Sequence, residues 1–150
     1  MGGAGNGAGQ LTVNAPEATC FEGARVPARP LDILMLMGRT DALYPKMVSV
    51  RDNALANYTL APSDRTVVKQ SGTAYTQTRA KKLGKPVVEW FDHAYEIDAA
   101  VAPLYATAKG HCIPGSTVPA NALYPVACKP PTALDWGAEI LSFFDAHPKP

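Results

Sequence analysis

The sequence lacks the features that mark membrane-spanning and nucleic-acid-binding proteins. No segment approaches the roughly 20 consecutive apolar residues that a transmembrane helix needs. Basic residues are also dispersed: the net charge is +1, and the densest basic stretch is Arg79–Lys82. Because nucleic-acid binding normally requires a concentrated basic face, we expect neither a membrane nor a nucleic acid as a partner.

A recognisable targeting signal is also missing. The stretch Met1–Gly9 is rich in glycine and has neither the charged start nor the apolar middle of a signal peptide. The pattern for N-myristoylation requires Ser or Thr where Asn6 stands. We expect residues 1–30 to form a coil-rich segment and residues 31–150 to hold the folded domain.

Cysteine is scarce, and its spacing leaves two alternatives open. Cys112 and Cys128 enclose a loop rich in proline and glycine. A disulfide between them would close about 15 residues and add roughly 3 kcal/mol of stability. Two free, partly buried thiols are the alternative, and in either case Cys20 has no obvious partner. Because adjacent ligands at His111 and Cys112 match no common zinc spacing, we expect no metal site and no cofactor.

The residues that are present suffice for a folded core. Apolar residues make up 47% of the chain and charged residues 18%, which is a globular composition. The run Leu31–Met37 is apolar except for Asp32, which predicts a strand buried on both faces in a parallel sheet. Further along, the pattern predicts helices over 47–58 and 134–146 and strands over 73–78, within 86–97 and over 101–107.

The last predicted helix has a broad apolar stripe that must pack on a sheet. Thr132 is the predicted N-cap, with Asp135 three residues later as in a capping box, and Pro148 ends the helix. The stripe consists of Trp136, Ile140, Phe143 and His147, widened by Leu134, Leu141 and Phe144.

Two turns that follow predicted strands carry an acid and a base. Asp41 ends the turn after the first strand, and His111 lies in the turn Lys109–Gly115 after the strand 101–107. Strand carboxyl ends meet at one rim of a parallel sheet, so both side chains would reach the same site. A carboxylate on one imidazole nitrogen leaves the other free to take a proton from a hydroxyl nucleophile. The structural alternatives are a helix cap at Asp41 and a backbone contact at His111.

Three segments resemble the C-terminal half of the esterase/polyhydroxybutyrate depolymerase family, which includes feruloyl-esterase-like members. They are Pro30–Pro45, Leu104–Gly115 with its Gly-His-Cys-Ile-Pro-Gly turn, and Leu134–Pro148. The resemblance implies a secreted or periplasmic enzyme that cleaves polyester or hydroxycinnamoyl esters with a Ser-Asp-His triad. It makes Asp41 the triad acid and His111 the triad base. It also implies the C-terminal portion of an α/β-hydrolase fold, mostly a parallel sheet with flanking helices.

The nucleophile of that triad is missing from the sequence. None of the serines lies in the Gly-x-Ser-x-Gly pattern of the nucleophile elbow; they are Ser49, Ser63, Ser71, Ser116 and Ser142. We therefore expect the elbow and the N-terminal strands to be absent and the 150-residue chain to be inactive alone. A catalytically inactive binding or interaction module is the alternative. An exposed edge of the strand beginning at Leu31 would favour self-association.

Two further histidines have structural interpretations. His93 lies in the aromatic segment 90–95, which is typical of a packed or exposed strand position. His147 lies at the end of the last predicted helix, where a partly charged imidazole is favourable.

Overall fold

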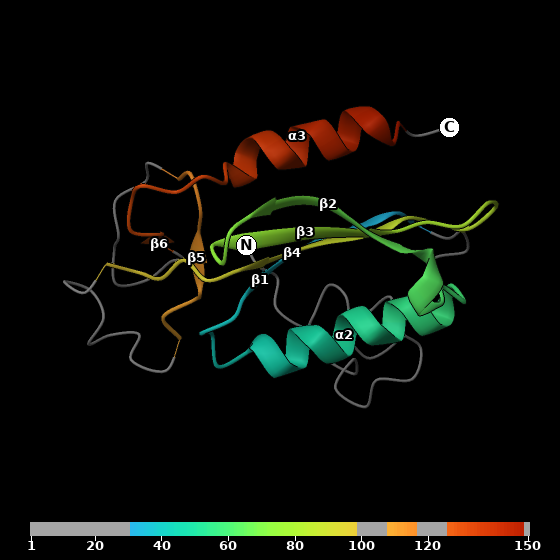
Figure 1. The fold of residues 1–150 in the computed structure, drawn as a ribbon, viewed down its shortest axis with the longest axis horizontal. Helices are drawn as coiled ribbons and strands as arrows, with labels where there is room; N and C mark the ends of the chain where they lie inside the picture. The colour runs from blue at the N-terminus through green and yellow to red at the C-terminus, as the bar shows by residue number, and fades with distance from the viewer. Residues whose placement is uncertain (1–30, 99–107, 117–125, 149–150) are drawn as a thin grey trace, which may run out of the picture.

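The computed structural model describes residues 31–98, 108–116 and 126–148. These residues form three layers, with a four-stranded sheet between two helices (Figure 1). The sheet consists of β1 (Ile33–Gly38), β2 (Arg65–Ser71), β3 (Tyr75–Ala80) and β4 (Val88–His93), in the order β1-β4-β3-β2. Helix α2 (Tyr44–Asn57) covers one face and helix α3 (Trp136–Ala146) lies over the other.

The sheet is mixed, so the prediction of a mostly parallel α/β-hydrolase sheet with flanking helices is wrong. Only β1 and β4 run parallel, while β4, β3 and β2 pair antiparallel. The physical reason is the length of the connections. Residues 72–74 alone join β2 to β3, and a connection this short reverses the chain, whereas a parallel pair needs a crossover of a dozen or more residues.

Three strands escaped the sequence pattern. β2 exposes nearly all its side chains and has a bulge between Val67 and Lys69, so it lacks the alternation that identifies a half-buried strand. β5 (Cys112–Ile113) and β6 (Val126–Ala127) form a short parallel pair near the end of the sheet where β1 leads into α2 (Figure 1). The predicted strand 101–107 and the predicted coil 1–30 lie outside the described residues.

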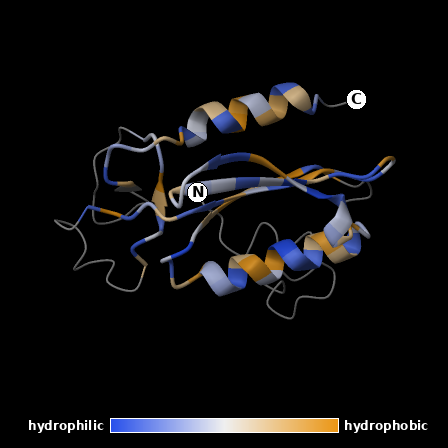
Figure 2. Cartoon of the chain, in the orientation of Figure 1, coloured by the Kyte–Doolittle hydropathy of each residue, from blue (hydrophilic) through white to orange (hydrophobic). Residues whose placement is uncertain are grey.

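The core has one cluster on each face of the sheet. Ile33, Met35 and Met37 of β1 pack with the buried face of α2. On the other face, Phe91 packs with Tyr75, Leu134 and Trp136. Hydrophobic and hydrophilic residues alternate along both helices (Figure 2), as expected for helices that each cover one face of a sheet.

Helix α3 differs from its prediction in two respects. Its N-cap is Asp135, whose side chain accepts a hydrogen bond from the Ala138 backbone N–H, while Thr132 Oγ1 accepts one from Gly115. Leu141 and Phe144, which were expected to widen the buried stripe, are 67% and 64% exposed. Among the described residues, no helix is long and apolar enough to cross a membrane.

Candidate acid–base site

Asp41 and His111 form a close pair. His111 Nδ1 lies 2.6 Å from Asp41 Oδ2, with the histidine side chain 28% exposed and the carboxylate side chain 9% exposed. The other carboxylate oxygen, Oδ1, accepts a hydrogen bond from the backbone N–H of Leu43, the N-cap of α2. One carboxylate therefore both supports the start of the helix and orients the imidazole, so the two interpretations of Asp41 are compatible.

Two glycines let the turns that carry this pair approach each other. A Cβ atom on Gly38 would lie 2.0 Å from the carbonyl oxygen of Gly110. A Cβ atom on Gly110 would lie 2.8 Å from the backbone nitrogen of Asp41. Asp41 also forms an isolated bridge with Ala108. Because any larger side chain would separate the two turns, the geometry of the pair depends on both glycines.

A disulfide fixes the chain immediately after the base. Cys112 and Cys128 are bonded to each other, which confirms that alternative over two free thiols. The bond ties β5 to the segment that follows β6 and so restrains the turn that presents His111. Cys20 lies outside the described residues.

His93 is a third polar group at this end of the sheet. It ends β4, pairs in register with Gly38, and is 1% exposed. Burial lowers the pKa of its imidazole to about 4; Arg39 acts in the same direction, whereas a hydrogen bond to the Tyr95 backbone and the charge of Asp41 oppose the shift. The ring is therefore neutral at neutral pH. Sequence reasoning identified a strand histidine here but not its closeness to the site.

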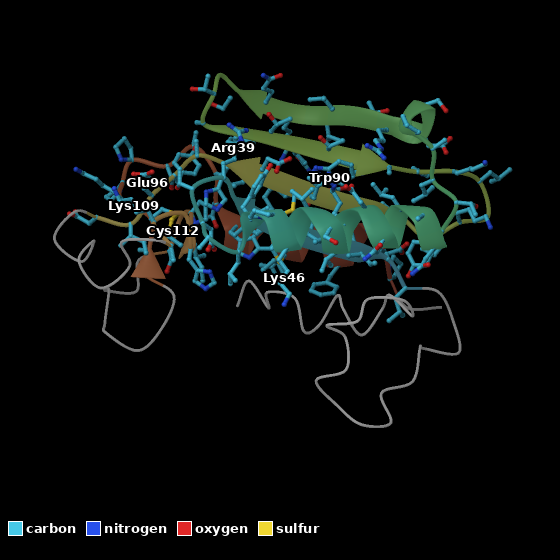
Figure 3. All side chains as sticks on the ribbon, turned by 90° about the horizontal axis from the view of Figure 1, so that it is seen from below. Arg39, Lys46, Trp90, Glu96, Lys109 and Cys112 are labelled. Carbon is cyan, nitrogen blue, oxygen red and sulfur yellow. A yellow bond between two sulfur atoms is a disulfide. The ribbon has the colours of Figure 1, made fainter. Side chains whose placement is uncertain are left out.

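The pair lies in a small pocket that is partly open to solvent. Its lining combines apolar side chains with a few polar ones and includes Leu36, Met37, Gly38, Asp41, Leu43, Tyr44, Met47, His93, Gly110, His111, Cys112 and Ile113. A mostly apolar pocket with a few converging polar groups is the usual form of a small-molecule site. Figure 3 places Arg39 and Cys112 toward the same end of the molecule, with Trp90 of β4 nearer its middle.

Tyr44 is held at the pocket wall by a network from β4. Its hydroxyl donates a hydrogen bond of 2.8 Å to Asp92 Oδ1, and the indole N–H of Trp90 donates to Oδ2 of the same carboxylate. Burial and the neighbouring Asp92 raise the pKa of Tyr44, so the phenol stays protonated. Arg39 donates to the backbone carbonyl of Asp92, which ties the turn after β1 to β4.

The pocket contains no serine. All five serines of the chain lie in the described residues, and none of them lines the pocket. His147 does not line it either; its Nδ1 lies 2.8 Å from the carbonyl oxygen of Phe143 in α3. The structure thus brings together the predicted acid and base without a hydroxyl nucleophile from a serine of this chain.

Comparison with protein-family models, with curated proteins and with solved structures finds no significant match to this chain. The resemblance to the esterase/polyhydroxybutyrate depolymerase family therefore stays a prediction. The functional proposal rests on the geometry of Asp41, His111 and their pocket.

Proposed function

We propose that this chain supplies the acid and the general base of a site that hydrolyses carboxylic esters. The observation that carries the proposal is the 2.6 Å separation between His111 Nδ1 and Asp41 Oδ2. A carboxylate at Nδ1 favours the tautomer with its proton on that nitrogen, which leaves the lone pair on Nε2. The partial exposure of His111 lets Nε2 meet a nucleophile, while Asp41 stays largely shielded.

The proposed chemistry is acyl transfer in two steps. Nε2 of His111 takes the proton of a hydroxyl group as its oxygen attacks the ester carbonyl carbon, and then gives that proton to the departing alkoxide. Water repeats the sequence on the acyl intermediate and releases the acid. Asp41 keeps the ring oriented and stabilises the imidazolium in both steps.

The pocket supports an ester of apolar character. Leu36, Met47 and Ile113 belong to its wall, and an apolar wall favours an aliphatic or aromatic acyl group over a charged one. We propose the polyester or hydroxycinnamoyl esters that the resemblance implies. The disulfide supports a secreted or periplasmic location, because structural disulfides persist mainly in oxidising compartments.

A binding module is the second candidate, and the absence of serine among the pocket-lining residues favours it. In that case the same pocket holds a ligand without turning it over. For the enzyme, the nucleophile must come from residues other than the five serines, either elsewhere in a longer polypeptide or on a partner chain.

The first test concerns the pair itself. In nitrogen-15 spectra of the whole chain we expect His111 as the Nδ1–H tautomer, with that proton strongly deshielded by Asp41. Asp41→Asn should remove the deshielding and change the tautomer. The matched control is Asp52→Asn, since Asp52 is an exposed carboxylate paired with Arg51. A His111 signal that is identical in wild type and Asp41→Asn would overturn the proposal.

The second test separates the enzyme from the binding module. The DNA upstream of Met1 is read for an in-frame Gly-x-Ser-x-Gly segment, and the longer product is assayed with p-nitrophenyl butyrate. We expect His111→Gln to lower kcat by at least about 10²-fold and His147→Gln to leave it unchanged. An authentic start at Met1, or turnover independent of His111, would favour the binding module.

A further inference from the structure

A histidine and two cysteines form a second, buried cluster next to the acid–base pair. The possible ligand atoms of His93, Cys112 and Cys128 all lie within 4.8 Å of one another. The three residues are 1%, 4% and 3% exposed, respectively. The cluster joins the end of β4 to the disulfide that follows His111. Sequence reasoning considered His111 as the partner of the two sulfurs, and the fold instead brings His93 to them.

One nitrogen of His93 has no hydrogen-bonding role in the described part of the fold. Among the described residues, Nδ1 of His93 has no hydrogen-bond partner although it is fully buried. A buried polar atom without a partner costs about 1–3 kcal/mol, and an apolar side chain would fill this place without that cost. A disulfide needs no imidazole beside it, so the bond between Cys112 and Cys128 does not account for the histidine.

We propose that His93, Cys112 and Cys128 bind a thiophilic d¹⁰ cation such as Zn²⁺ when the disulfide is reduced. One imidazole nitrogen and two thiolates form a donor set that Zn²⁺ prefers. Two thiolates and a neutral imidazole also cancel the charge of the divalent cation, so the filled cluster is uncharged. Charge neutrality matters here because an uncompensated charge is very costly at a buried position.

The proposed steps balance as follows. A dithiol reductant transfers two electrons and two protons to the Cys112–Cys128 bond and becomes a disulfide itself. Each new thiol then releases its proton to solvent as its sulfur bonds the cation. His93 bonds through the lone pair of Nδ1 and releases no proton. Exchange with a small-molecule disulfide, which accepts the two electrons and two protons and becomes a dithiol, re-forms the Cys112–Cys128 bond, removes both thiolate ligands and expels the cation.

The neighbouring pocket gives the site an entry path. His93 and Cys112 both line the pocket that holds Asp41 and His111. Zn²⁺ usually takes four ligands, and a water molecule from the pocket can supply the fourth. This inference does not depend on ester hydrolysis: the cluster would bind the cation whether or not His111 acts as a base.

The test uses the whole chain with Cys20→Ser, so that Cys112 and Cys128 are its only thiols. The protein is stripped with a chelator and titrated with Zn²⁺ and Co²⁺ under argon, once reduced with a phosphine and once oxidised. We expect the reduced chain to bind one ion with thiolate-to-cobalt charge-transfer absorption, and the oxidised chain to show no such absorption.

Substitutions then identify the ligands. We expect His93→Gln to weaken the binding of Zn²⁺ by at least about tenfold, equivalent to 1.4 kcal/mol, and Cys112→Ser with Cys128→Ser to abolish the charge-transfer band. His147→Gln is the matched control and should bind as the parent does. Equal affinity of the reduced parent and His93→Gln would overturn the proposal.

A second measurement covers the case in which His93→Gln does not fold. Zn²⁺ should protect Cys112 and Cys128 of the reduced, unsubstituted chain from alkylation by N-ethylmaleimide, while Cys20 serves as an internal comparison. Mass spectrometry of the peptides measures each site separately. Alkylation of both cysteines at the same rate with and without Zn²⁺ would equally overturn the proposal.

Discussion

The two outer strands of the described sheet are built from opposite kinds of residue. In the β1–β4 half, β1 has no charged side chain, and both strands are buried over most of their length. In the β2–β3 half, β2 forms the outer edge, carries Arg65 and Lys69, and exposes nearly all its side chains. Charged residues and a bulge are what natural proteins use to protect a sheet edge from pairing. β2 has both, whereas β1 has neither.

The difference shows where the chain places its chemistry. Asp41, Gly38 and His93 all belong to the β1–β4 half, where they lie at or just after the ends of the strands. A backbone packed on both faces holds such groups to a narrow range of positions. β2 exposes nearly all its side chains to solvent, and neither β2 nor β3 contributes a residue to the pocket lining among the described residues. Changes in the first half should therefore be costly and changes in β2 mild.

The largest effect that we expect in the β1–β4 half is the pH dependence caused by His93. Burial lowers the pKa of His93 to about 4 in the folded chain, against about 6.5 for a free histidine, so between these values only the unfolded state binds the proton. The stability that the chain gains by keeping His93 neutral is fully present above about pH 6.5. The free energy of unfolding then falls by about 3 kcal/mol as the pH drops to about 4. Urea unfolding of the oxidised, chelator-treated chain at several pH values measures this.

Two variants isolate that effect. His93→Phe cannot titrate and should lose most of the slope between pH 4 and 6.5 (about 1.4 kcal/mol per pH unit). His147→Gln removes a histidine that lies outside the pocket lining and should retain the slope. Identical slopes in wild type and His93→Phe would show that another group dominates the acid response.

The next effect concerns the contact between the two turns. Gly38→Ala places a Cβ atom 2.0 Å from the Gly110 carbonyl oxygen, so one turn must move. We expect a loss of about 2 kcal/mol together with loss of the deshielded Nδ1–H signal of His111. Gly137→Ala, in helix α3, is the control: its Cβ atom would lie 3.3 Å from Asp135 Oδ1, a side-chain atom that can shift, so the change in stability should be well below that of Gly38→Ala. A stable Gly38→Ala chain with an unchanged His111 signal would contradict the packing described here.

Parts of the fold could be predicted because they depend on local burial. The run Leu31–Met37 is apolar because β1 is covered on both faces, and the stripe around Phe143 reports the face that α3 turns to the sheet. β2 could not be predicted, since an exposed edge strand needs no apolar alternation. The parallel prediction failed because an apolar run indicates burial and not strand direction, which the short connection 72–74 decides.

The site also has a part that local sequence predicts and a part that depends on long-range contacts. The closeness of Asp41 and His111 could be predicted because each lies in or just after a turn that contains a glycine. The approach of His93 to Cys112 and Cys128 could not, because it depends on the parallel register of β1 with β4 and on a disulfide between distant residues. Both are contacts between residues far apart in the sequence, and no pattern in a single sequence indicates that such residues lie close together.

The next prediction compares the two edge strands of the described sheet, β1 and β2. Ile33 donates its backbone N–H to Val87, so the N–H of Leu34 faces the other side of β1, where no strand of the described residues pairs with it. We expect the chain to self-associate through this edge and Leu34→Lys to weaken association at least about tenfold, or 1.4 kcal/mol. Val67→Lys, at a 54% exposed position of β2, should leave association unchanged. Sedimentation of folded samples over a concentration series measures the association of wild type and both variants. A wild type that stays monomeric at every concentration would contradict the prediction of self-association.

The smallest expected effect belongs to β2, where Lys69 bonds Glu139 of α3 at 2.7 Å. This ion pair connects β2 with α3, but the lysine side chain is 50% exposed. Water already solvates much of the charge of Lys69. Lys69→Met keeps a side chain of similar length and should lower the free energy of unfolding by less than about 0.5 kcal/mol; in high salt this difference should disappear. Glu139→Gln should behave alike, and the double variant should equal either single one. A loss above about 1 kcal/mol would exceed what an exposed ion pair contributes. It would mean that β2 matters to the stability of the fold as β1 does, although the two strands differ in composition.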